Sequence, residues 1–352
     1  MNLGLRLLLA VAFLGLLGLG GAWLFDGGEA EGAHGGDARS PTVGQDPRFR
    51  WTSSVQCKEC HQDVWDEWYG SHHQISYLNP EVAAQSQNFQ NKECQACHLP
   101  QQIAVTGFAQ RALPRMTRYD QGVDCITCHV SGEGEVFAAH AVPSAPCKPV
   151  ADTRFTSMDL CEGCHNQHFT TDQWRASAWA KKGTSCNDCH MPDVERKLAA
   201  GGTRKGRHHG FAGAHDAAML EKAGTFEYRV EGKELVLALT NSGAGHNFPT
   251  EERHRAVDIV YSFTDRDGKH QTFQDAAQQP TEFGLAYRFR QPYRDEAGEN
   301  TQLVAGDRKE VRVPIPDGSV SVKLRVWYRL QPYIGDSHPA STLLEEHEID
   351  LR

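Results

Sequence analysis

The chain has 352 residues, 45 of them acidic and 36 basic, and a formal net charge of −9. This acidic balance argues against nucleic acid as a partner, because surfaces that bind nucleic acid are basic. Ten of the eleven cysteines belong to one recurring motif, so the chemistry of that motif governs the rest of the interpretation.

The N-terminal residues 1–25 are predicted to be a signal sequence or a membrane anchor. Residues 7–25 carry no charge and follow Arg6, and as a helix this run is long enough to cross a bilayer core. The run exceeds the usual length of a secretory apolar region, which favours an uncleaved anchor over a cleaved signal. Residues 26–48 are rich in Gly, Ala and acidic side chains and are predicted to be a linker. Both alternatives place the remaining chain outside the cytoplasm.

Residues 49–223 hold five C-x-x-C-H motifs, the attachment signature of c-type haem. Two thiols on one helical turn can each bond to a vinyl group of the porphyrin, and the next histidine can then bind the iron as the proximal ligand. The motifs comprise Cys57, Cys60 and His61; Cys94, Cys97 and His98; Cys125, Cys128 and His129; Cys161, Cys164 and His165; and Cys186, Cys189 and His190.

A zinc site or a redox dithiol is the alternative for any single copy of this motif. Zinc sites pair one C-x-x-C with a second C-x-x-C or with spaced histidines, which does not match five copies with the histidine at one fixed offset. The sequence therefore predicts five covalently attached haem c groups. Because residues 51–220 contain no run of five apolar residues, the haems must supply much of the core. We expect one short helix per motif, long loops, and folding coupled to haem attachment.

Residues 224–352 change to an alternation of apolar and polar positions. Phe226, Tyr228 and Val230 alternate, and runs that begin at residues 235, 257 and 320 do the same. Alternation with period two predicts half-buried strands, and about seven strands over this length suggest a β-sandwich. The predicted fold class is α+β: a mainly helical and loop multihaem cytochrome domain nucleated by five haems, followed by a C-terminal β-sandwich.

Electron-transfer haems usually need a second axial ligand, and histidine should dominate because only four methionines follow Met1. Four candidates come from their local sequence: His73, with His72 as its alternative; His140, in an apolar loop; His168, for which a surface position is equally compatible; and His209, preferred over His208 and His215. Solvent-exposed positions are expected for His34, His254, His270, His338 and His347.

At these residues the chain resembles the multihaem c-type cytochromes related to the tetrahaem cytochrome that accepts electrons from hydroxylamine oxidoreductase. The resemblance covers about residues 51–260. It rests on four stretches: W-x-x-S-x-H ending at His73, Cys186 to Pro192, His209 to Gly213, and residues 243–250 around His246. It implies that His73 and His246 are distal ligands.

One motif departs from the pattern of that family. In W-x-x-S-x-W, from Trp174 through Ser177 to Trp179, tryptophan replaces the histidine, and an indole nitrogen does not bind haem iron. Either another residue serves that iron or the iron has an open side. Cys147, the one cysteine outside the motifs, is interpreted as a buried or capped thiol in preference to a catalytic one.

These features favour an electron carrier that relays single electrons between redox-partner proteins on the periplasmic or extracellular side. Catalysis is left uncertain. One alternative is a multihaem oxidoreductase acting on a small nitrogen or sulfur oxyanion at one open haem. A second alternative is a subunit of an extracellular haem filament. The lysine-containing motif C-x-x-C-K that marks the catalytic haem of pentahaem nitrite reductases is absent from the sequence.

Overall fold

The computed structural model describes residues 51–198, 201–250, 255–275, 278–292 and 298–352. The predicted anchor (1–25), the predicted linker (26–48), His34 and His254 lie outside the described residues. Within the described ranges, no helix has the length and apolar character needed to span a membrane. All described residues lie within one compact unit, residues 43–352.

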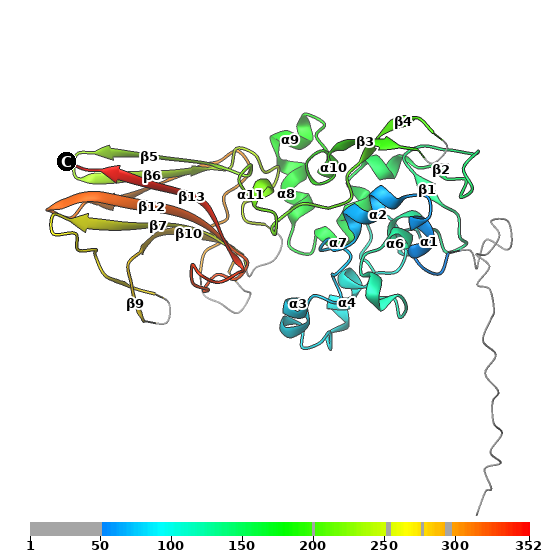
Figure 1. Ribbon diagram of the computed structural model, residues 1–352, viewed down its shortest axis with the longest axis horizontal. Coiled ribbons are helices and arrows are strands. Elements are labelled where there is room, and N and C mark those ends of the chain that lie inside the picture. The colour runs from blue at the N-terminus through cyan, green and yellow to red at the C-terminus, as the bar shows by residue number, and fades with distance from the viewer. Residues whose placement is uncertain (1–50, 199–200, 251–254, 276–277, 293–297) are drawn as a thin grey trace, which may run out of the picture. The chain divides into compact units, whose positions relative to one another are not determined.

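Short helices and long loops make up residues 51–220, as the sequence predicted (Figure 1). Two short strand pairs interrupt them. β1 (Phe137–Ala138) pairs with β2 (Val150–Ala151) in parallel, and β3 (Asp193–Lys197) pairs with β4 (Thr203–Arg207) in antiparallel orientation. The helices are α1 (Val55–Lys58), α2 (Gln62–Trp68), α3 (Pro80–Gln85), α4 (Lys92–His98), α5 (Ile103–Thr106), η2 (Tyr119–Gln121), α6 (Cys125–His129), η3 (Thr153–Thr156), α7 (Asp159–His165), α8 (Thr170–Ala176), α9 (Ala178–Lys181), α10 (Cys186–His190) and α11 (Ala217–Leu220).

Four of the five C-x-x-C-H motifs lie entirely on one helix each, namely on α4, α6, α7 and α10. One helical turn places both cysteines and the histidine on neighbouring positions of the same surface, as haem attachment requires. The first motif differs, because α1 ends at Lys58 and His61 is the N-cap of α2.

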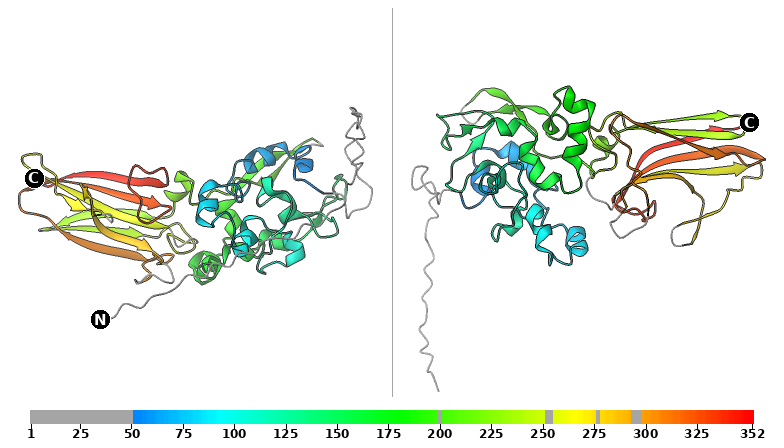
Figure 2. Two further views of the ribbon diagram at one scale, coloured as in Figure 1. Left: turned by 90° about the horizontal axis from the view of Figure 1, so that it is seen from below. Right: turned by 180° about the vertical axis from the view of Figure 1, so that it is seen from behind.

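Two antiparallel sheets form the C-terminal part of the chain, and Figure 2 shows their strands from two further sides. The four-stranded sheet has the order β10-β7-β12-β13, and the three-stranded sheet has the order β11-β6-β5. A two-stranded pair, β8 (Phe273–Gln274) with β9 (Pro280–Thr281), accompanies them. The sheet strands are β5 (Thr225–Glu231), β6 (Glu234–Thr240), β7 (Ala256–Asp265), β10 (Gly284–Arg290), β11 (Arg308–Pro314), β12 (Ser319–Arg329) and β13 (Ser341–Asp350).

The two sheets share one hydrophobic core built from their alternating apolar residues. Leu235, Leu237 and Leu239 of β6 are buried with the corresponding side chains of β7 and β12. Burial on this scale is the main source of stability for such a part, since each buried aliphatic side chain contributes about 1.5–3 kcal/mol. Strands β6, β7 and β12 form where the alternation predicted them, but β6 and most of β7 are buried on both faces and are not half-buried.

Edge strand β5 departs from the predicted half-buried pattern. Phe226 is buried, but Tyr228 and Val230 are 40% and 45% exposed. On the outer face of the same sheet, Val236 of central strand β6 is fully buried between Arg229 and Arg312 of the two neighbouring strands. Long charged side chains of the edge strands therefore cover small apolar residues of the central strand.

Candidate haem-binding sites

Three of the helices that carry C-x-x-C-H motifs, α4, α6 and α10, begin at a side-chain cap. We number the sites one to five in chain order, with proximal histidines His61, His98, His129, His165 and His190. Asn91 caps α4 by accepting the amide N–H of Glu93, and Asp124 caps α6 by accepting that of Thr127. At α10 the residues Ser185 and Asp188 form a reciprocal capping box. Side-chain caps at the first turn stabilise short helices that would be marginal alone.

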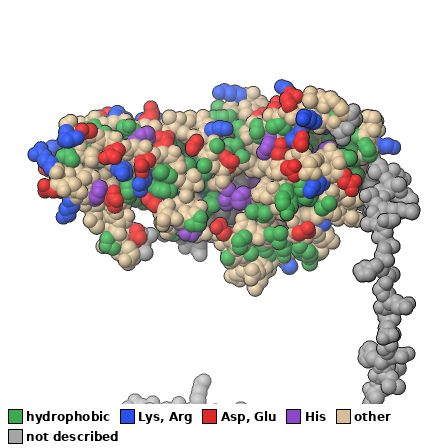
Figure 3. Space-filling view, in the orientation of Figure 1, with side chains coloured by type: hydrophobic (Ala, Val, Ile, Leu, Met, Phe, Trp, Pro, Cys, Tyr) green, Lys and Arg blue, Asp and Glu red, His purple; other side chains and the backbone are tan. Residues whose placement is uncertain are grey.

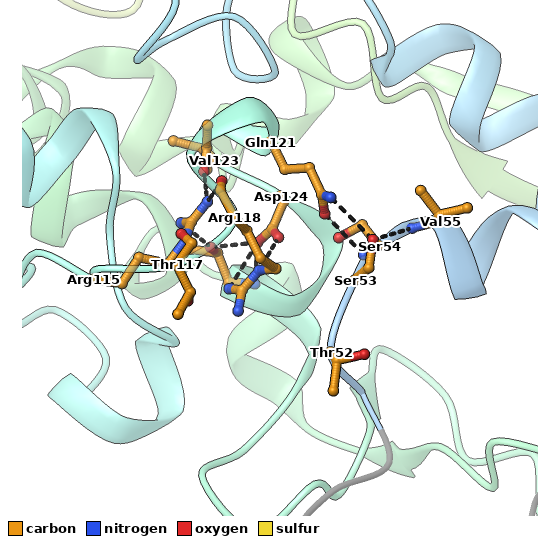
Figure 4. Close-up of polar contacts among 12 residues, drawn as sticks. Thr52, Ser53, Ser54, Val55, Arg115, Thr117, Arg118, Gln121, Val123 and Asp124 are labelled. Atoms are coloured by element: carbon orange, nitrogen blue, oxygen red, sulfur yellow. Dashed lines mark hydrogen bonds and ion pairs between the residues drawn. The ribbon is translucent and has the colours of Figure 1, made fainter. Parts of the chain in front are cut away.

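A buried polar network fixes the helix of site three (Figure 4). Asp124 is 2% exposed and accepts the amide of Thr127 at 2.8 Å and its hydroxyl at 2.6 Å. Arg118 forms an ion pair with the same carboxylate at 2.6 Å. Arg115 donates to Gly122 O at 2.6 Å and to Pro100 O at 2.6 Å, which ties this helix to the segment after site two. Burial lowers the pKa of Arg115 to about 10, so the guanidinium stays charged near neutral pH.

Backbone carbonyls orient the proximal imidazoles at three sites. Nδ1 of His98 lies 2.9 Å from Ser76 O, Nδ1 of His129 lies 2.8 Å from Phe137 O, and Nδ1 of His190 lies 2.7 Å from Ala212 O. An Nδ1–H donated to a carbonyl leaves Nε2 as the free lone pair, the arrangement found in metal-binding histidines. The donor set of these residues therefore fits haem iron.

Three of the proximal imidazoles face a second imidazole at the spacing of a shared metal. An imidazole nitrogen lies about 2 Å from a bound metal and the ring centre about 1 Å beyond it, so rings on opposite sides have centres about 6 Å apart. The observed centroid separations are 6.4 Å for His129 with His209, 6.0 Å for His165 with His73, and 6.3 Å for His190 with His246. In the space-filling view, histidine side chains gather near the middle of the visible face (Figure 3).

Backbone carbonyls also orient the second imidazole in two of these pairs. Nδ1 of His209 lies 2.8 Å from Arg207 O, and Nδ1 of His246 lies 2.9 Å from Asn247 O. Burial lowers the pKa of His73 to about 3 and that of His209 to about 4. Both rings are therefore neutral near pH 7, which is the form that binds a metal.

The alternative candidates have different contacts: this applies to His72, His208 and His215. The rings of His72 and His215 stack directly at 3.6 Å, which leaves no room for a metal between them. Nδ1 of His208 accepts the amide of Gly210 at 3.0 Å, and its Nε2 lies 3.7 Å from Glu67. The preference for His209 over its neighbours agrees with this geometry.

His140 and His168 are not brought opposite a proximal histidine in the described residues. His140 is exposed in the loop between β1 and β2, and His168 is partly buried between α7 and α8. At site one, His61 interacts electrostatically with Arg204 and Arg196, and at site two the ring of Phe89 lies 5.6 Å from that of His98. The second ligands of these two sites therefore remain predictions.

Two residues that the sequence analysis did not single out help to assemble the pairs. The ring of Phe211 lies 4.1 Å from that of His73 and 5.8 Å from that of His209, so it packs between two candidate distal ligands. Glu67 of α2 accepts the amide of His209 at 2.9 Å and forms an ion pair with Arg196. The His209 to Gly213 motif was the only sequence signal for Phe211, and nothing in the spacing indicated Glu67.

The sites adjoin one another through their cysteines. Cysteines of different motifs interact with one another: Cys57 with Cys125, and Cys161 with Cys186. Cys128 interacts electrostatically with Cys161. These contacts link sites one, three, four and five in that order, and the contact between α4 and α7 brings site two beside site four.

Comparison with known proteins agrees with this geometry. Residues 56–130 match the family described as cytochrome c554 and c-prime. The fold is similar to that of a penta-heme cytochrome c552 from Thermochromatium tepidum, with a TM-score of 0.61 and 18% sequence identity. The resemblance to multihaem c-type cytochromes is confirmed. Haem c as the cofactor and electron transport as the function are thereby supported.

The structural similarity is not limited to the haem-binding part. The alignment covers 85% of this chain and 98% of the cytochrome c552 chain. Because residues 49–223 make up about half of the chain, such an alignment must extend into the two sheets. No curated protein matches the chain significantly. A specific relation to the partner of hydroxylamine oxidoreductase has no support in these comparisons.

Proposed function

We propose that the chain is a pentahaem electron carrier that relays single electrons between redox-partner proteins outside the cytoplasm. Its residues 49–223 attach five haem c groups and its residues 224–352 form a β-sandwich. The observation that carries the proposal is the set of three facing imidazole pairs at 6.0–6.4 Å.

Two imidazoles on one iron favour electron transfer over substrate chemistry. When bound, haem c supplies an iron that gains and loses one electron. Histidines on both sides leave no coordination position for a substrate at sites three, four and five. The neutral, buried state of His73 and His209 keeps their lone pairs available for this role.

Continuity of the sites supports a relay. The cysteine contacts join sites one, three, four and five, and His73 interacts electrostatically with His165, His190 and His209, which belong to three different sites. A chain of adjoining sites gives an electron a path through the protein without a mobile carrier.

The arrangement at site five weakens the enzymatic alternative. Trp179 replaces the histidine that its motif has in the resembling family, which would leave one iron open. His246 lies opposite His190 near this tryptophan. It provides a ligand from residues 224–352, which we call the β part. The second ligands of sites one and two are proposed from the remaining predicted set, His140 and His168.

The location of the protein belongs to the same proposal. The uncharged run at residues 7–25 supports attachment to a membrane, with the haem-binding part on the periplasmic or extracellular side, where c-type haems are attached in bacteria. The net charge of −9 favours protein partners over nucleic acid.

Mass spectrometry and carbon monoxide binding test the proposal together. The mature holoprotein should exceed the mass of its polypeptide by five haem groups, and the reduced protein should show no absorbance change with carbon monoxide. A mass with four haems or fewer would contradict the predicted count. A change on adding carbon monoxide would reveal an open iron and favour the oxidoreductase alternative.

A further inference from the structure

The two W-x-x-S-x motifs share the hydrogen bonds around their serine but end in different side chains: the amide of Ser71 donates to Trp68 O and the amide of Ser177 donates to Trp174 O, each at 2.9 Å. Trp68 ends α2, and the hydroxyl of Ser71 accepts the amide of Gln74, three residues on, at 3.3 Å. In the second copy the hydroxyl of Ser177 accepts the amide of Ala180, also three residues on, at 3.4 Å. The residue two positions after the serine is His73 in the first copy and Trp179 in the second. Relative to the serine, Trp179 therefore has the sequence position that His73 has in the first copy.

The side chain of Trp179 packs against the loop that carries His246. A Cβ atom added to Gly245 would lie 3.4 Å from Cβ and Cγ of Trp179 and 3.2 Å from Cδ1 of Trp174. The two indoles, which we call the indole pair, thus touch the backbone next to His246. Glycine allows this close approach because it has no Cβ.

Polar side chains of α8, the helix that carries Trp174, contact the same loop. Oε1 of Gln173 accepts the amide of Asn247 at 3.2 Å and the hydroxyl of Thr250 at 2.8 Å. The hydroxyls of Thr170 and Thr250 are 2.9 Å apart. Thr170, Gln173 and Trp174 have the i, i+3, i+4 spacing of one helix face, so α8 presents a continuous surface to the loop.

Within the β part, Asn241 fixes the same loop from the opposite side. Its side chain is fully buried, and its amide donates to His246 O at 2.8 Å and to Leu303 O at 3.0 Å. Its side-chain oxygen accepts the amide of Ala244 at 3.2 Å. These hydrogen bonds hold the loop against the β part. The direction in which His246 points then depends on where the loop docks.

We propose that the indole pair, with Gln173, is the docking surface that positions His246 as the distal ligand of site five. In this chain the ligand of site five comes from the β part, and the tryptophan at residue 179 orients it. Trp179 is a positioning residue, since it acts through His246. This inference rests on the proposed function, in which His190 and His246 share one iron.

The test compares ferric spin state and redox titration in fully haem-loaded variants. His246→Ala should convert one haem of five to high spin. Trp179→Ala should produce the same high-spin signal in part of the molecules and shift the same redox wave. Trp179→Phe, which keeps an aromatic ring against Gly245, should restore the low-spin spectrum. In the His246→Ala background, Trp179→Ala should add no further change, because both substitutions act through one ligand.

Gln173→Ala tests the same docking surface without removing a large aromatic side chain. Gln173→Ala removes two hydrogen bonds to the loop and should give a smaller shift of the same wave. Asp172→Ala is the matched control, since Asp172 is exposed on α8 and contacts Asn166 and Arg175, outside the loop.

The outcomes separate the two claims. A high-spin haem in His246→Ala, with wild-type spectra in both Trp179→Ala and Gln173→Ala, would overturn the positioning role and leave the ligand assignment intact. Low-spin spectra in His246→Ala would overturn the ligand assignment at site five, and the positioning role with it.

Discussion

The imidazoles of His190 and His246 face each other at 6.3 Å with 14° between their planes, although one belongs to a haem-attachment helix and the other to a loop of the β part. Nδ1 of each ring is hydrogen-bonded to a backbone carbonyl, as is usual for metal-binding histidines. In the proposed assignment the β part is a component of site five, because it supplies one axial ligand.

The first prediction concerns the electrochemical effect of this ligand. Haem potentials span about 0.8 V across axial ligand types, so loss of one imidazole should move one haem by a large part of that range. We expect His246→Ala to shift one of five waves in a spectroelectrochemical titration and leave the other four nearly unchanged. His338→Ala is the control, since His338 lies in the loop between β12 and β13. A titration curve identical to that of the wild type would falsify this assignment.

The second prediction concerns the backbone under the His246 loop. A Cβ atom at Gly243 would lie 1.7 Å from the carbonyl oxygen of Lys222, so Gly243→Ala forces the loop to move. The expected result is a high-spin signal from one haem, as in His246→Ala, together with lower stability of the β part. Gly335→Ala is the matched control, because nothing lies within 4 Å of its added Cβ. Electron paramagnetic resonance of both variants checks this, and equal low-spin spectra would count against the role of the loop.

The third prediction concerns the buried carboxylate of site three. Asp124→Ala removes the cap of α6 and leaves Arg118 without its ion-pair partner. Breaking a buried pair from one side costs about 3 kcal/mol. We expect the midpoint of chemical denaturation to fall accordingly, and the yield of fully loaded protein to fall with it. Asp120→Ala is the control, because Asp120 is an exposed carboxylate on the same segment. Equal midpoints for the two variants would show that the network does not support the site.

The sequence predicted candidate ligands but not which of them lie opposite one another. The five motifs identify the proximal histidines, and local motifs or the family resemblance singled out His73, His209 and His246. Which distal ring faces which proximal ring was not predictable, because the members of each pair are more than fifty residues apart and no spacing rule joins them. The pairing depends on tertiary packing, such as Phe211 between two distal rings.

The limits of local patterns also appear in the β part and around site three. The alternation predicted β6, β7 and β12 because their inward residues form one core. It overestimated the burial of β5, since Tyr228 and Val230 lie on an edge strand whose neighbours do not cover them. Arg115 was not predicted as a core residue, because its burial depends on four backbone carbonyls and one hydroxyl contributed by separate loops.

The fourth prediction returns a ligand to the position it has in the first motif. The hydroxyls of Ser71 and Ser177 each accept the amide three residues on, so a histidine at residue 179 has the same position relative to this turn as His73. The double variant with Trp179→His and His246→Ala should therefore regain a six-coordinate, low-spin haem at site five. His246→Ala alone should stay high-spin, and so should the double variant with Trp179→Phe and His246→Ala, which supplies a ring without a nitrogen ligand. Spin state by electron paramagnetic resonance distinguishes them. A histidine double variant that remains high-spin would show that residue 179 does not point at this iron, and that His246 is the ligand for reasons of domain docking alone.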